Sequence, residues 1–218
     1  MEPKILSAVS RSTLKRLPLY LHVLEDLHRR GVVYVSCTTI ARKFDFGPIL
    51  VRKDLEVTGA AGKAKIGFRV AGLIDDIKKF LGWHNVQDAF LVGAGNLGKA
   101  LLGYQDFDSY GLNIVAVFDN DPRKIGTRIF NKEVLALDKL APLVKRMHIN
   151  IGIVAVSSEG AQAVVDALVA AGIRAVWNFA PAPLEIPEGV ILENARLTQS
   201  LAVLTNKLKS LLAGPEKE

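Results

Sequence analysis

The chain has 218 residues, 50% of them hydrophobic and 23% charged, with a formal net charge of +6. That balance is typical of a globular protein and excludes disorder or a coiled coil as the state of the whole chain. The charge is uneven, because residues 1–82 hold 15 Lys and Arg against 8 Asp and Glu, a net +7, whereas residues 83–218 hold 13 against 14, a net −1. This asymmetry indicates a basic module for an anionic partner, joined to a neutral domain with a different task.

Cysteine usage and apolar runs narrow the class further. Cys37 is the single cysteine, which excludes an intramolecular disulfide and a cysteine zinc site, and its apolar neighbours favour a small buried side chain over a nucleophile. Residues 1–16 carry five charged side chains in place of an apolar leader, and no apolar run reaches about 20 residues. We therefore expect a cytoplasmic protein.

The basic third begins with a predicted helix. Apolar residues recur at helical spacing between Ser12 and Arg29. Because proline is unfavourable inside a helix, a start at Leu17 is favoured, with Pro18 in the first turn. Gly31 ends this helix, and the β-branched residues that follow predict an extended stretch.

Two more helices and a hairpin follow in the basic third. Ser36 is the predicted N-cap of a helix that runs to about Phe44. A third helix is predicted over residues 48–57, and Gly59 stops it. Residues 62–68 form a basic hairpin bounded by glycines. This order of elements is that of a winged helix-turn-helix.

In such a module the third helix enters the major groove of DNA while basic side chains contact phosphates. On this helix we expect Arg52 and Lys53 to point outward, and Ile49, Val51 and Leu55 to face the core. A solvated basic face is the alternative, but clustering on one helix and the hairpin favours double-stranded DNA as the partner. The candidate DNA contacts are Arg11, Arg16, Ser36, Arg42, Lys43, Arg52, Lys53, Lys63 and Lys65.

The neutral part opens with a nucleotide-binding signature. Residues 86–92 form a predicted buried strand that leads directly into a G-x-G-x-x-G loop and a helix, the context that this motif requires. Gly93 allows the tight turn, Gly95 lets the backbone approach a pyrophosphate, and Gly98 lets helix and strand pack closely. The start of the helix offers N–H donors to the phosphates. The candidate loop residues are Gly93, Ala94, Gly95, Asn96, Leu97 and Gly98.

An acidic residue follows at the spacing typical of dinucleotide sites. The predicted strand 113–118 ends at Asp119, 21 residues after Gly98. A carboxylate there accepts hydrogen bonds from ribose hydroxyls and repels a 2′-phosphate, so NAD(H) is favoured over NADP(H). A simple turn residue is the alternative role for Asp119, and Asp121 is the second candidate for the ribose contact.

Strands and helices then alternate along the chain. The remaining predicted segments are a helix over 138–146, a strand over 150–156, a helix over 159–171 closed by Gly172 and a strand over 173–178. This alternation predicts a doubly wound parallel sheet. Because ligands bind beyond the carboxyl ends of such strands, residues 156–158 and 178–181 are expected to line one pocket with the glycine loop. The candidate contacts there are Ser157, Asn178, Phe179, Ala180 and Pro181.

The C-terminal segment carries one apolar stripe at helical spacing. Its members are Leu197, Leu201, Leu204, Leu208 and Leu211. The stripe could pack on its own domain or pair with a second copy. A protein that reads palindromic DNA needs a two-fold axis, which favours a homodimerisation helix.

Residues for catalysis are missing from the expected position. Hydride transfer needs an acid or base near the nicotinamide, and none of the four histidines follows the carboxyl end of a strand. Tyr104 is the only plausible donor, and packing is its favoured role. A cofactor pocket without catalytic residues, joined to a DNA-binding module, indicates a sensor and not an enzyme. The alternatives are an NAD-dependent dehydrogenase and a CoA-binding module, and Asp119 disfavours the latter because CoA carries a 3′-phosphate.

Six segments together are specific for one family. They are Arg-Ser-Thr-Leu-Lys-Arg-Leu at 11–17, Val-Arg-Lys-Asp-Leu at 51–55, Gly62-Lys63 with Gly67, the loop 93–98, Phe118-Asp119 with Asp121-Pro122, and Asn-Phe-Ala-Pro at 178–181. On these segments the chain resembles the Rex family of redox-sensing transcriptional repressors over nearly its whole length.

The resemblance implies a homodimer with swapped C-terminal helices that binds operator DNA, senses the NADH/NAD+ ratio and leaves the DNA when NADH binds. It implies targets in fermentative or respiratory metabolism. It also implies that Arg52 and Lys53 contact the operator, that the glycine loop holds the pyrophosphate, and that Tyr104 and Phe179 lie toward the nicotinamide.

Several positions depart from the family pattern. Lys65 replaces a glycine of the hairpin and Phe68 replaces a tyrosine. The family often has Arg at the position of His22 and Asp at that of Arg196, a pair thought to form across domains, so this pair is impossible here. Ser157-Ser158 stands where the family commonly has a turn with proline.

The predicted fold is therefore an α/β protein in three parts. Residues 1–82 form a winged-helix DNA-binding domain, residues 83–196 a Rossmann-type NAD(H)-binding domain, and residues 197–218 a dimerisation helix and tail.

Overall fold

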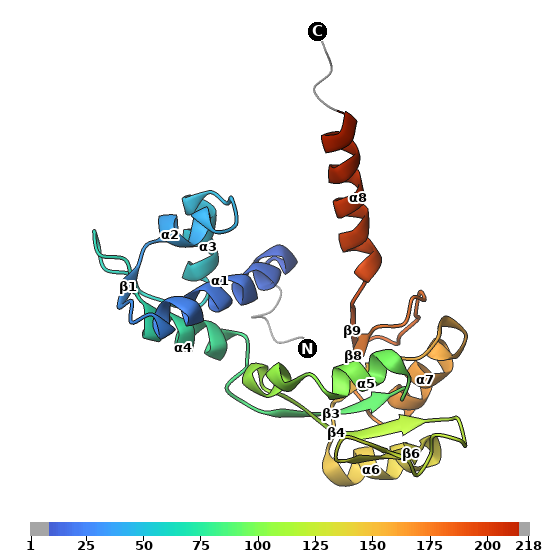
Figure 1. Ribbon diagram of the computed structural model, residues 1–218. Coiled ribbons are helices and arrows are strands. Elements are labelled where there is room, and N and C mark those ends of the chain that lie inside the picture. The colour runs from blue at the N-terminus through green and yellow to red at the C-terminus, as the bar shows by residue number, and fades with distance from the viewer. Residues whose placement is uncertain (1–8, 214–218) are drawn as a thin grey trace. The chain divides into compact units, whose positions relative to one another are not determined.

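The computed structural model describes residues 9–213, apart from the side chains of residues 197 and 213. The chain divides into two compact units (Figure 1). The N-terminal unit comprises the residues up to Asn85 together with Ser109–Gly111, and the C-terminal unit comprises Val86–Asp108 and the residues from Leu112 onward. Mixed helices and a parallel sheet confirm the predicted α/β fold class.

The N-terminal unit consists of helices that enclose one apolar core beside a short antiparallel sheet. In the described part of this unit the elements are α1 (Arg11–Arg29), β1 (Tyr34–Val35), α2 (Cys37–Arg42), α3 (Pro48–Glu56), β2 (Phe68–Arg69) and α4 (Val70–Phe80). Strand β1 pairs with β2, with Tyr34 opposite Arg69. The core side chains of α1, α3 and α4 form one cluster, which includes Leu17, Tyr20, Leu21, Leu24, Val51, Leu55, Val70, Leu73 and Ile77.

Helix α1 is longer than predicted. It begins at Arg11, because the side chain of Ser10 caps it by accepting a hydrogen bond from the Thr13 N–H at 3.0 Å. The expected start at Leu17 was wrong, and Pro18 lies inside the helix. Proline removes one backbone hydrogen bond, but this loss is offset by burial of a complete apolar face. The members of that face are Leu17, Tyr20, Leu21 and Leu24.

Helix α4 was not predicted, although its sequence carries the signal. Val70, Leu73 and Ile77 are spaced for one helical face, and all three are buried. The helix packs against α1. It completes the small core that the three predicted helices alone would leave open.

The predictions for α2 and α3 were largely confirmed. Ser36 caps α2 by accepting a hydrogen bond from the Thr39 N–H at 3.1 Å, and α3 begins with Pro48 in its first turn. One orientation was wrong, because Ile49 is 73% exposed while Val51 and Leu55 are fully buried. Ile49 precedes Val51 by two residues, about 200° around the helix, and therefore lies on the opposite face.

The hairpin between α3 and β2 is closed by a bridge between Lys63 and Gly67. Lys65 adopts a φ of +63°, in the left-handed region that favours glycine. The chain therefore keeps the turn geometry in spite of the lysine, at a cost in backbone strain.

The C-terminal unit is built on a seven-stranded sheet with the order β5-β6-β4-β3-β7-β8-β9. All neighbours are parallel except β5 and β6, which form an antiparallel hairpin at one edge. The strands are β3 (Gln87–Val92), β4 (Leu112–Asp119), β5 (Arg128–Ile129), β6 (Lys132–Ala136), β7 (Ile151–Val154), β8 (Ala175–Asn178) and β9 (Ile191–Asn194). Strand β5 has only two residues and β9 forms an edge of the sheet, and neither was predicted. Strand β6, with five residues between β5 and β4, was also not predicted.

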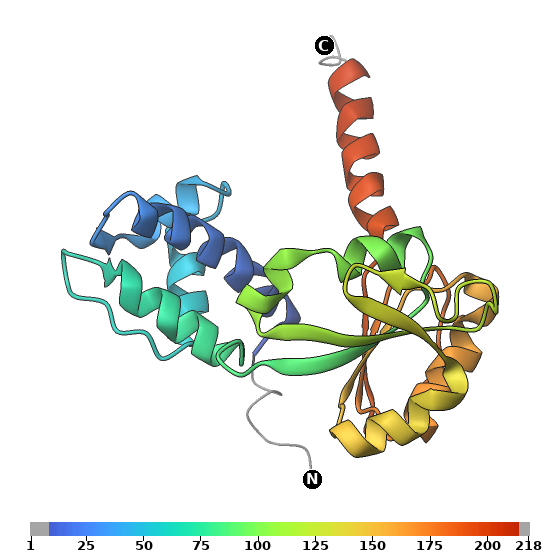
Figure 2. The same ribbon diagram turned by 60° about the horizontal axis from the view of Figure 1, so that its bottom comes forward.

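Helices cover both faces of this sheet (Figure 2). Helices α6 (Leu140–Met147) and α7 (Ser158–Ala170) pack on the face that holds Phe90 and Phe118. Helix α5 (Asn96–Leu102) and part of the 3₁₀ segment η2 (Gln105–Tyr110) pack on the other face, against Leu91 and Val117. Alternate residues of β3 thus point to opposite cores, as expected for a strand buried on both faces.

The final helix, α8 (Leu197–Ala213), follows β9. Its predicted apolar stripe is exposed at the four leucines whose side chains are described, by 57% at Leu201, 64% at Leu204, 49% at Leu208 and 77% at Leu211. The fifth member, Leu197, and the tail 214–218 lie outside the described side chains. None of the helices in residues 9–213 is both long and apolar enough to cross a membrane.

Candidate nucleotide site and DNA-binding surface

The glycine loop connects β3 to α5 in a tight turn. Gly93 has a φ of +109°, and a Cβ at this residue would lie 2.3 Å from the carbonyl oxygen of Ala155. A Cβ at Gly98 would overlap the carbonyl oxygen of Gly93, so only glycine allows this helix to approach the strand. A Cβ at Gly95, in contrast, would meet no atom within 4 Å. The loop therefore leaves open space beside its middle glycine, where a ligand can reach the backbone.

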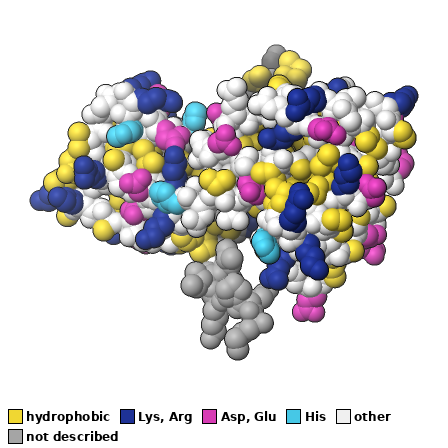
Figure 3. Space-filling model, turned by 90° about the horizontal axis from the view of Figure 1, so that it is seen from below, with side chains coloured by type: hydrophobic (Ala, Val, Ile, Leu, Met, Phe, Trp, Pro, Cys, Tyr) yellow, Lys and Arg dark blue, Asp and Glu magenta, His cyan; other side chains and the backbone are white. Residues whose placement is uncertain are grey.

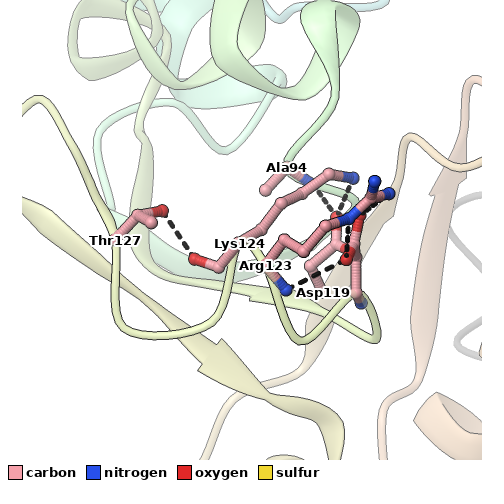
Figure 4. A network of polar contacts seen from close by, with 6 residues as sticks. Ala94, Asp119, Arg123, Lys124 and Thr127 are labelled. Carbon is pink, nitrogen blue, oxygen red and sulfur yellow. Dashed lines mark hydrogen bonds and ion pairs between the residues drawn. The ribbon is translucent and has the colours of Figure 1, made fainter.

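Asp119 is the acidic partner of this loop. It ends β4 and is only 5% exposed. Its Oδ2 accepts a hydrogen bond from the Ala94 N–H at 2.8 Å (Figure 4). Its Oδ1 accepts one from the Asp121 N–H at 2.9 Å. The carboxylate thus fixes the loop and the turn that follows β4.

A cation that the sequence analysis did not anticipate completes this network. The Nζ of Lys124 lies 2.9 Å from Oδ2 of Asp119 (Figure 4). Burial alone would raise the pKa of Asp119, but the hydrogen bonds from Asp121, Lys124 and Ala94 hold this pKa below its ordinary value. The carboxylate is therefore ionised at neutral pH and already neutralised by a lysine whose side chain is 40% exposed.

Asp121, the second candidate for the ribose contact, is engaged elsewhere. Its carboxylate accepts hydrogen bonds from Nε and Nη2 of Arg123 at 3.0 and 2.8 Å, which lowers the pKa of Asp121 to about 2. It is not among the described residues that line the cavity beside Asp119. Asp119 is thus the better placed of the two carboxylates.

The loop and Asp119 share one cavity of about 380 Å³. Ser157, at the start of α7, also lines it. Small-molecule sites commonly have volumes of about 300–1,000 Å³. Open space at Gly95 and a buried acceptor at Asp119 in one cavity fit a dinucleotide with free ribose hydroxyls.

The segment after β8 lines a second cavity. This cavity has about 560 Å³, and its walls include Phe179, Ala180, Pro181 and Arg196. The Asn178 side chain is buried and shapes the turn by accepting a hydrogen bond from the Ala180 N–H at 2.9 Å and donating to the Ala180 carbonyl. Asn178 also donates to Oδ1 of Asn194 at 2.8 Å, so its amide positions the 178–181 segment.

An aromatic row joins two further candidates. The ring centroids of Tyr104 and Phe107 are 4.8 Å apart, and those of Phe107 and Trp177 are 5.7 Å apart. The centroids of Trp177 and Phe179 are 4.7 Å apart. Phe107, Trp177 and Phe179 pack against the core on the α5 face of the sheet, and Tyr104 extends the row through its contact with Phe107, so Tyr104 and Phe179 are linked although they are far apart in sequence.

The predicted DNA-binding side chains are exposed on the N-terminal unit. On α3, Arg52 and Lys53 point to solvent, and Arg52 forms an exposed ion pair with Glu56 at 3.0 Å. Exposed ion pairs are worth little, so this pair can yield to another partner. The remaining exposed candidates are Arg11, Ser36, Arg42, Lys43, Lys63 and Lys65. Figure 3 shows basic side chains at the left-hand end of this unit.

Arg16 differs from the other DNA-binding candidates in its surroundings. Its Nε and Nη2 donate to the two carboxylate oxygens of Asp54 at 2.6 and 2.7 Å, and its side chain is only 18% exposed. Thr13 and Tyr20 also donate to Asp54, at 2.9 and 2.7 Å. Burial would raise the pKa of Asp54, but these three partners hold it below its ordinary value. We call this cluster of Thr13, Arg16, Tyr20 and Asp54 the α1–α3 lock.

Comparison with known proteins places this geometry in a family. Residues 8–56 match the model "Putative DNA-binding protein N-terminus", and residues 84–182 match "CoA binding domain". The redox-sensing transcriptional repressor Rex of Treponema denticola is 44% identical over 88% of this chain and 91% of its own length. The protein of the same name from Carboxydothermus hydrogenoformans is 42% identical over 92% of this chain and 97% of its own length.

Solved structures of one Rex-family repressor match this chain over most of its length. The crystal structure of RSP, a Rex-family repressor, has a TM-score of 0.86 and 34% identity, and covers 94% of this chain and 96% of its own. RSP has also been solved in complex with β-NADH, at the same TM-score, and with β-NAD+ and operator DNA, at a TM-score of 0.85.

A helix-turn-helix unit joined to a dinucleotide-type sheet domain defines a ligand-responsive transcription regulator. The chain belongs to the Rex family of redox-sensing transcriptional repressors.

Proposed function

We propose that this protein represses transcription by binding operator DNA as a homodimer and that it leaves the DNA when NADH binds. The observation that carries the proposal is the cavity in which the glycine loop and Asp119 meet, in a chain whose relatives are named as redox-sensing repressors and not as enzymes. We assign DNA binding to residues 1–82, NAD(H) binding to 83–196 and dimerisation to 197–218. Because its partner is the operator, the protein acts in the cytoplasm.

In this proposal the dinucleotide site is built around the first cavity. Gly95 and its loop neighbours present backbone N–H groups to the pyrophosphate, and Asp119 accepts hydrogen bonds from the adenine ribose. Phe179 and Tyr104 lie toward the nicotinamide. Asn178 and Asp121 act through other residues, because the first shapes the 178–181 turn and the second donates its backbone N–H to Asp119.

DNA recognition is assigned to the exposed basic side chains of the N-terminal unit. Arg52 and Lys53 on α3 face the bases, while the lysines of the 62–68 hairpin, Arg11 at the start of α1 and the two ends of α2 face phosphates. Arg16 takes a different part, because the α1–α3 lock uses its guanidinium to fix the orientation of α3.

Dimerisation is assigned to α8, whose exposed leucines would otherwise remain in water. A homodimer presents two copies of α3 to a palindromic operator. Because the DNA and NADH sites lie in separate units, NADH must favour a conformation that binds DNA less well. Coupling of this kind typically changes the affinity for the second ligand, here the operator, by about 5- to 150-fold.

The division of labour is tested by one substitution at the DNA-binding surface. Arg52→Ala should weaken operator binding by at least about 30-fold, since each of two copies loses a contact worth about 1–3 kcal/mol, and NADH affinity should not change. Fluorescence anisotropy with labelled operator and an NADH fluorescence titration measure the two affinities.

Arg30→Ala is the matched control. Arg30 also forms an exposed i,i+4 ion pair, to Asp26 at 3.1 Å, but lies at the end of α1. The Arg30→Ala substitution should leave the affinities for operator DNA and for NADH unchanged. Equal loss of DNA and NADH binding in Arg52→Ala would contradict the proposal, and hydride transfer to a substrate or tighter binding of CoA than of NADH would favour the dehydrogenase or the CoA module instead.

A further inference from the structure

The exposed face of α3 carries an apolar side chain that the proposed function does not use. Ile49 is 73% exposed, which makes it the most exposed large hydrophobic residue outside α8 in the described chain. It lies at the start of the helix, directly after Pro48, and none of the core clusters among the described residues includes it. Burial inside the unit therefore does not explain an isoleucine at this position.

Helical spacing places Ile49 beside the two basic residues of α3. Arg52 follows it by three residues and Lys53 by four, so the three side chains share one face. Val51 and Leu55 occupy the opposite, buried face. A partner that covers Ile49 must therefore also accept two cations.

Duplex DNA meets both requirements. Its phosphates and the guanine edge accept the cations, and the 5-methyl group of thymine is the apolar group that a base pair presents in the major groove. Further exposed basic side chains flank the helix at Arg42 and Lys43 and on the hairpin at Lys63 and Lys65. Glu56 is exposed on the same face and pairs with Arg52, but the surface around Ile49 is mainly basic and thus complementary to a polyanion, whereas an apolar protein partner would offer these cations no acceptor.

Resting on the proposed function, we infer that Ile49 is a base-reading residue, whose side chain contacts a thymine methyl group in each operator half-site. Ile49 lies about 4.5 Å along the helix axis from Arg52. Base pairs are spaced by about 3.4 Å. The thymine therefore lies one or two base pairs from the pair that Arg52 contacts, and Ile49 selects an A·T pair there.

The test removes the methyl group alone. Duplexes that bind the full-length protein are selected from a random pool, and each thymine of the best duplex is then replaced symmetrically by uracil. For the wild-type protein, one replacement should weaken binding by about fourfold for each half-site, or about 15-fold for both, the value of burying a methyl group.

Substitutions at Ile49 complete a thermodynamic cycle. Ile49→Ala should weaken binding to the thymine duplex by a similar factor and should not respond to uracil at that position, and Ile49→Val should give an intermediate response. Leu19→Ala is the matched control, because Leu19 is an exposed apolar residue on α1 (43%) and its loss should leave the response to uracil intact.

The outcomes separate this inference from the function on which it rests. If selection recovers a duplex but no uracil replacement weakens wild-type binding, Ile49 does not contact a thymine methyl group. The same conclusion follows if the Ile49→Ala variant responds to uracil as the wild type does. In both cases the proposed repressor function stands. If selection recovers no duplex, both fail.

Discussion

Each of the two units contains one buried aspartate whose carboxylate accepts hydrogen bonds from three residues, one of them a cation, and the two networks have different tasks. In the N-terminal unit, Asp54 is held by Nε and Nη2 of a mostly buried Arg16. In the C-terminal unit, Asp119 is held by Lys124, a more exposed lysine, and lines a cavity.

The difference shows how the surroundings of a carboxylate decide its role. A bidentate arginine in a closed network leaves no acceptor for a ligand and fixes one helix against another. A single lysine at the rim of a cavity leaves room beside the carboxylate and can move aside. The first network is therefore structural, and we propose that the second keeps Asp119 ionised for a ligand.

The largest expected effect comes from opening the α1–α3 lock. Asp54→Ala removes one partner of a buried ion pair and leaves Arg16 without its acceptor, which should reduce the free energy of unfolding of the N-terminal unit by about 3–5 kcal/mol. Denaturant unfolding followed by Trp83 in a Trp177→Phe background measures this unit, since each unit holds one of the two tryptophans. A loss below about 1 kcal/mol would place Asp54 among ordinary surface pairs.

Asp119→Ala should weaken NADH binding and leave operator binding intact, the reverse of what we expect for Arg52→Ala. Loss of a charged acceptor for ribose hydroxyls should weaken NADH binding by about 10- to 100-fold, and operator binding without NADH should stay unchanged. Asp88→Ala is the control. Asp88 is also an aspartate on the sheet, but it is exposed, lies at the end of β3 away from the glycine loop, and accepts a hydrogen bond from the Asn113 side chain. Unchanged NADH affinity in Asp119→Ala would show that the ribose lies elsewhere.

Lys124→Met sharpens the role of the second network. Lys124 neutralises Asp119, so its removal should strengthen the repulsion of a 2′-phosphate. NADPH binding should weaken by about tenfold, whereas NADH binding should change by less than about threefold, because the lysine is partly exposed. Parallel titrations with both dinucleotides measure the ratio, and equal effects on the two would remove Lys124 from the selectivity of the site.

The smallest expected effect is the change with pH in the stability that the α1–α3 lock contributes to the N-terminal unit. Because the pKa of Asp54 is lowered in the folded state, its contribution to stability is full above the unfolded pKa of about 3.9 and is lost as the pH falls below it. Burial raises the pKa of Tyr20, so its contribution is full below about pH 10 and is lost above it. Asp54→Asn should flatten the acid side of the stability curve measured with Trp83, and an unaltered curve would contradict this assignment.

Local signals were predictable from the sequence, and long-range pairs were not. The glycine loop, Asp119 at a strand end and the Ser36 cap each depend on residues close together in the chain. In the α1–α3 lock, Asp54 on α3 bonds Arg16 and Thr13 on α1, which lie 38 and 41 residues away in the sequence. No local sequence pattern predicts these contacts. Lys124 lies only five residues from Asp119, but the turn that brings them together is a property of the fold.

Orientation was the other source of error. The apolar character of Ile49 predicts a core position, but its distance from Val51 in helical register places it opposite the buried face. Pro18 predicts a helix boundary because proline is costly inside a helix, but the burial of the rest of α1 outweighs that cost.

The central claim is that NADH, bound in one unit, releases DNA from the other. The direct test is titration of a complex between the full-length protein and labelled palindromic operator with NADH, NAD+ and NADPH, followed by anisotropy. NADH should dissociate the complex at about ten times its dissociation constant, where most sites are filled, and NAD+ at matched occupancy should leave it intact. In Asp119→Ala the same release should need correspondingly more NADH. A complex that stays intact when NADH fills its sites would contradict the account.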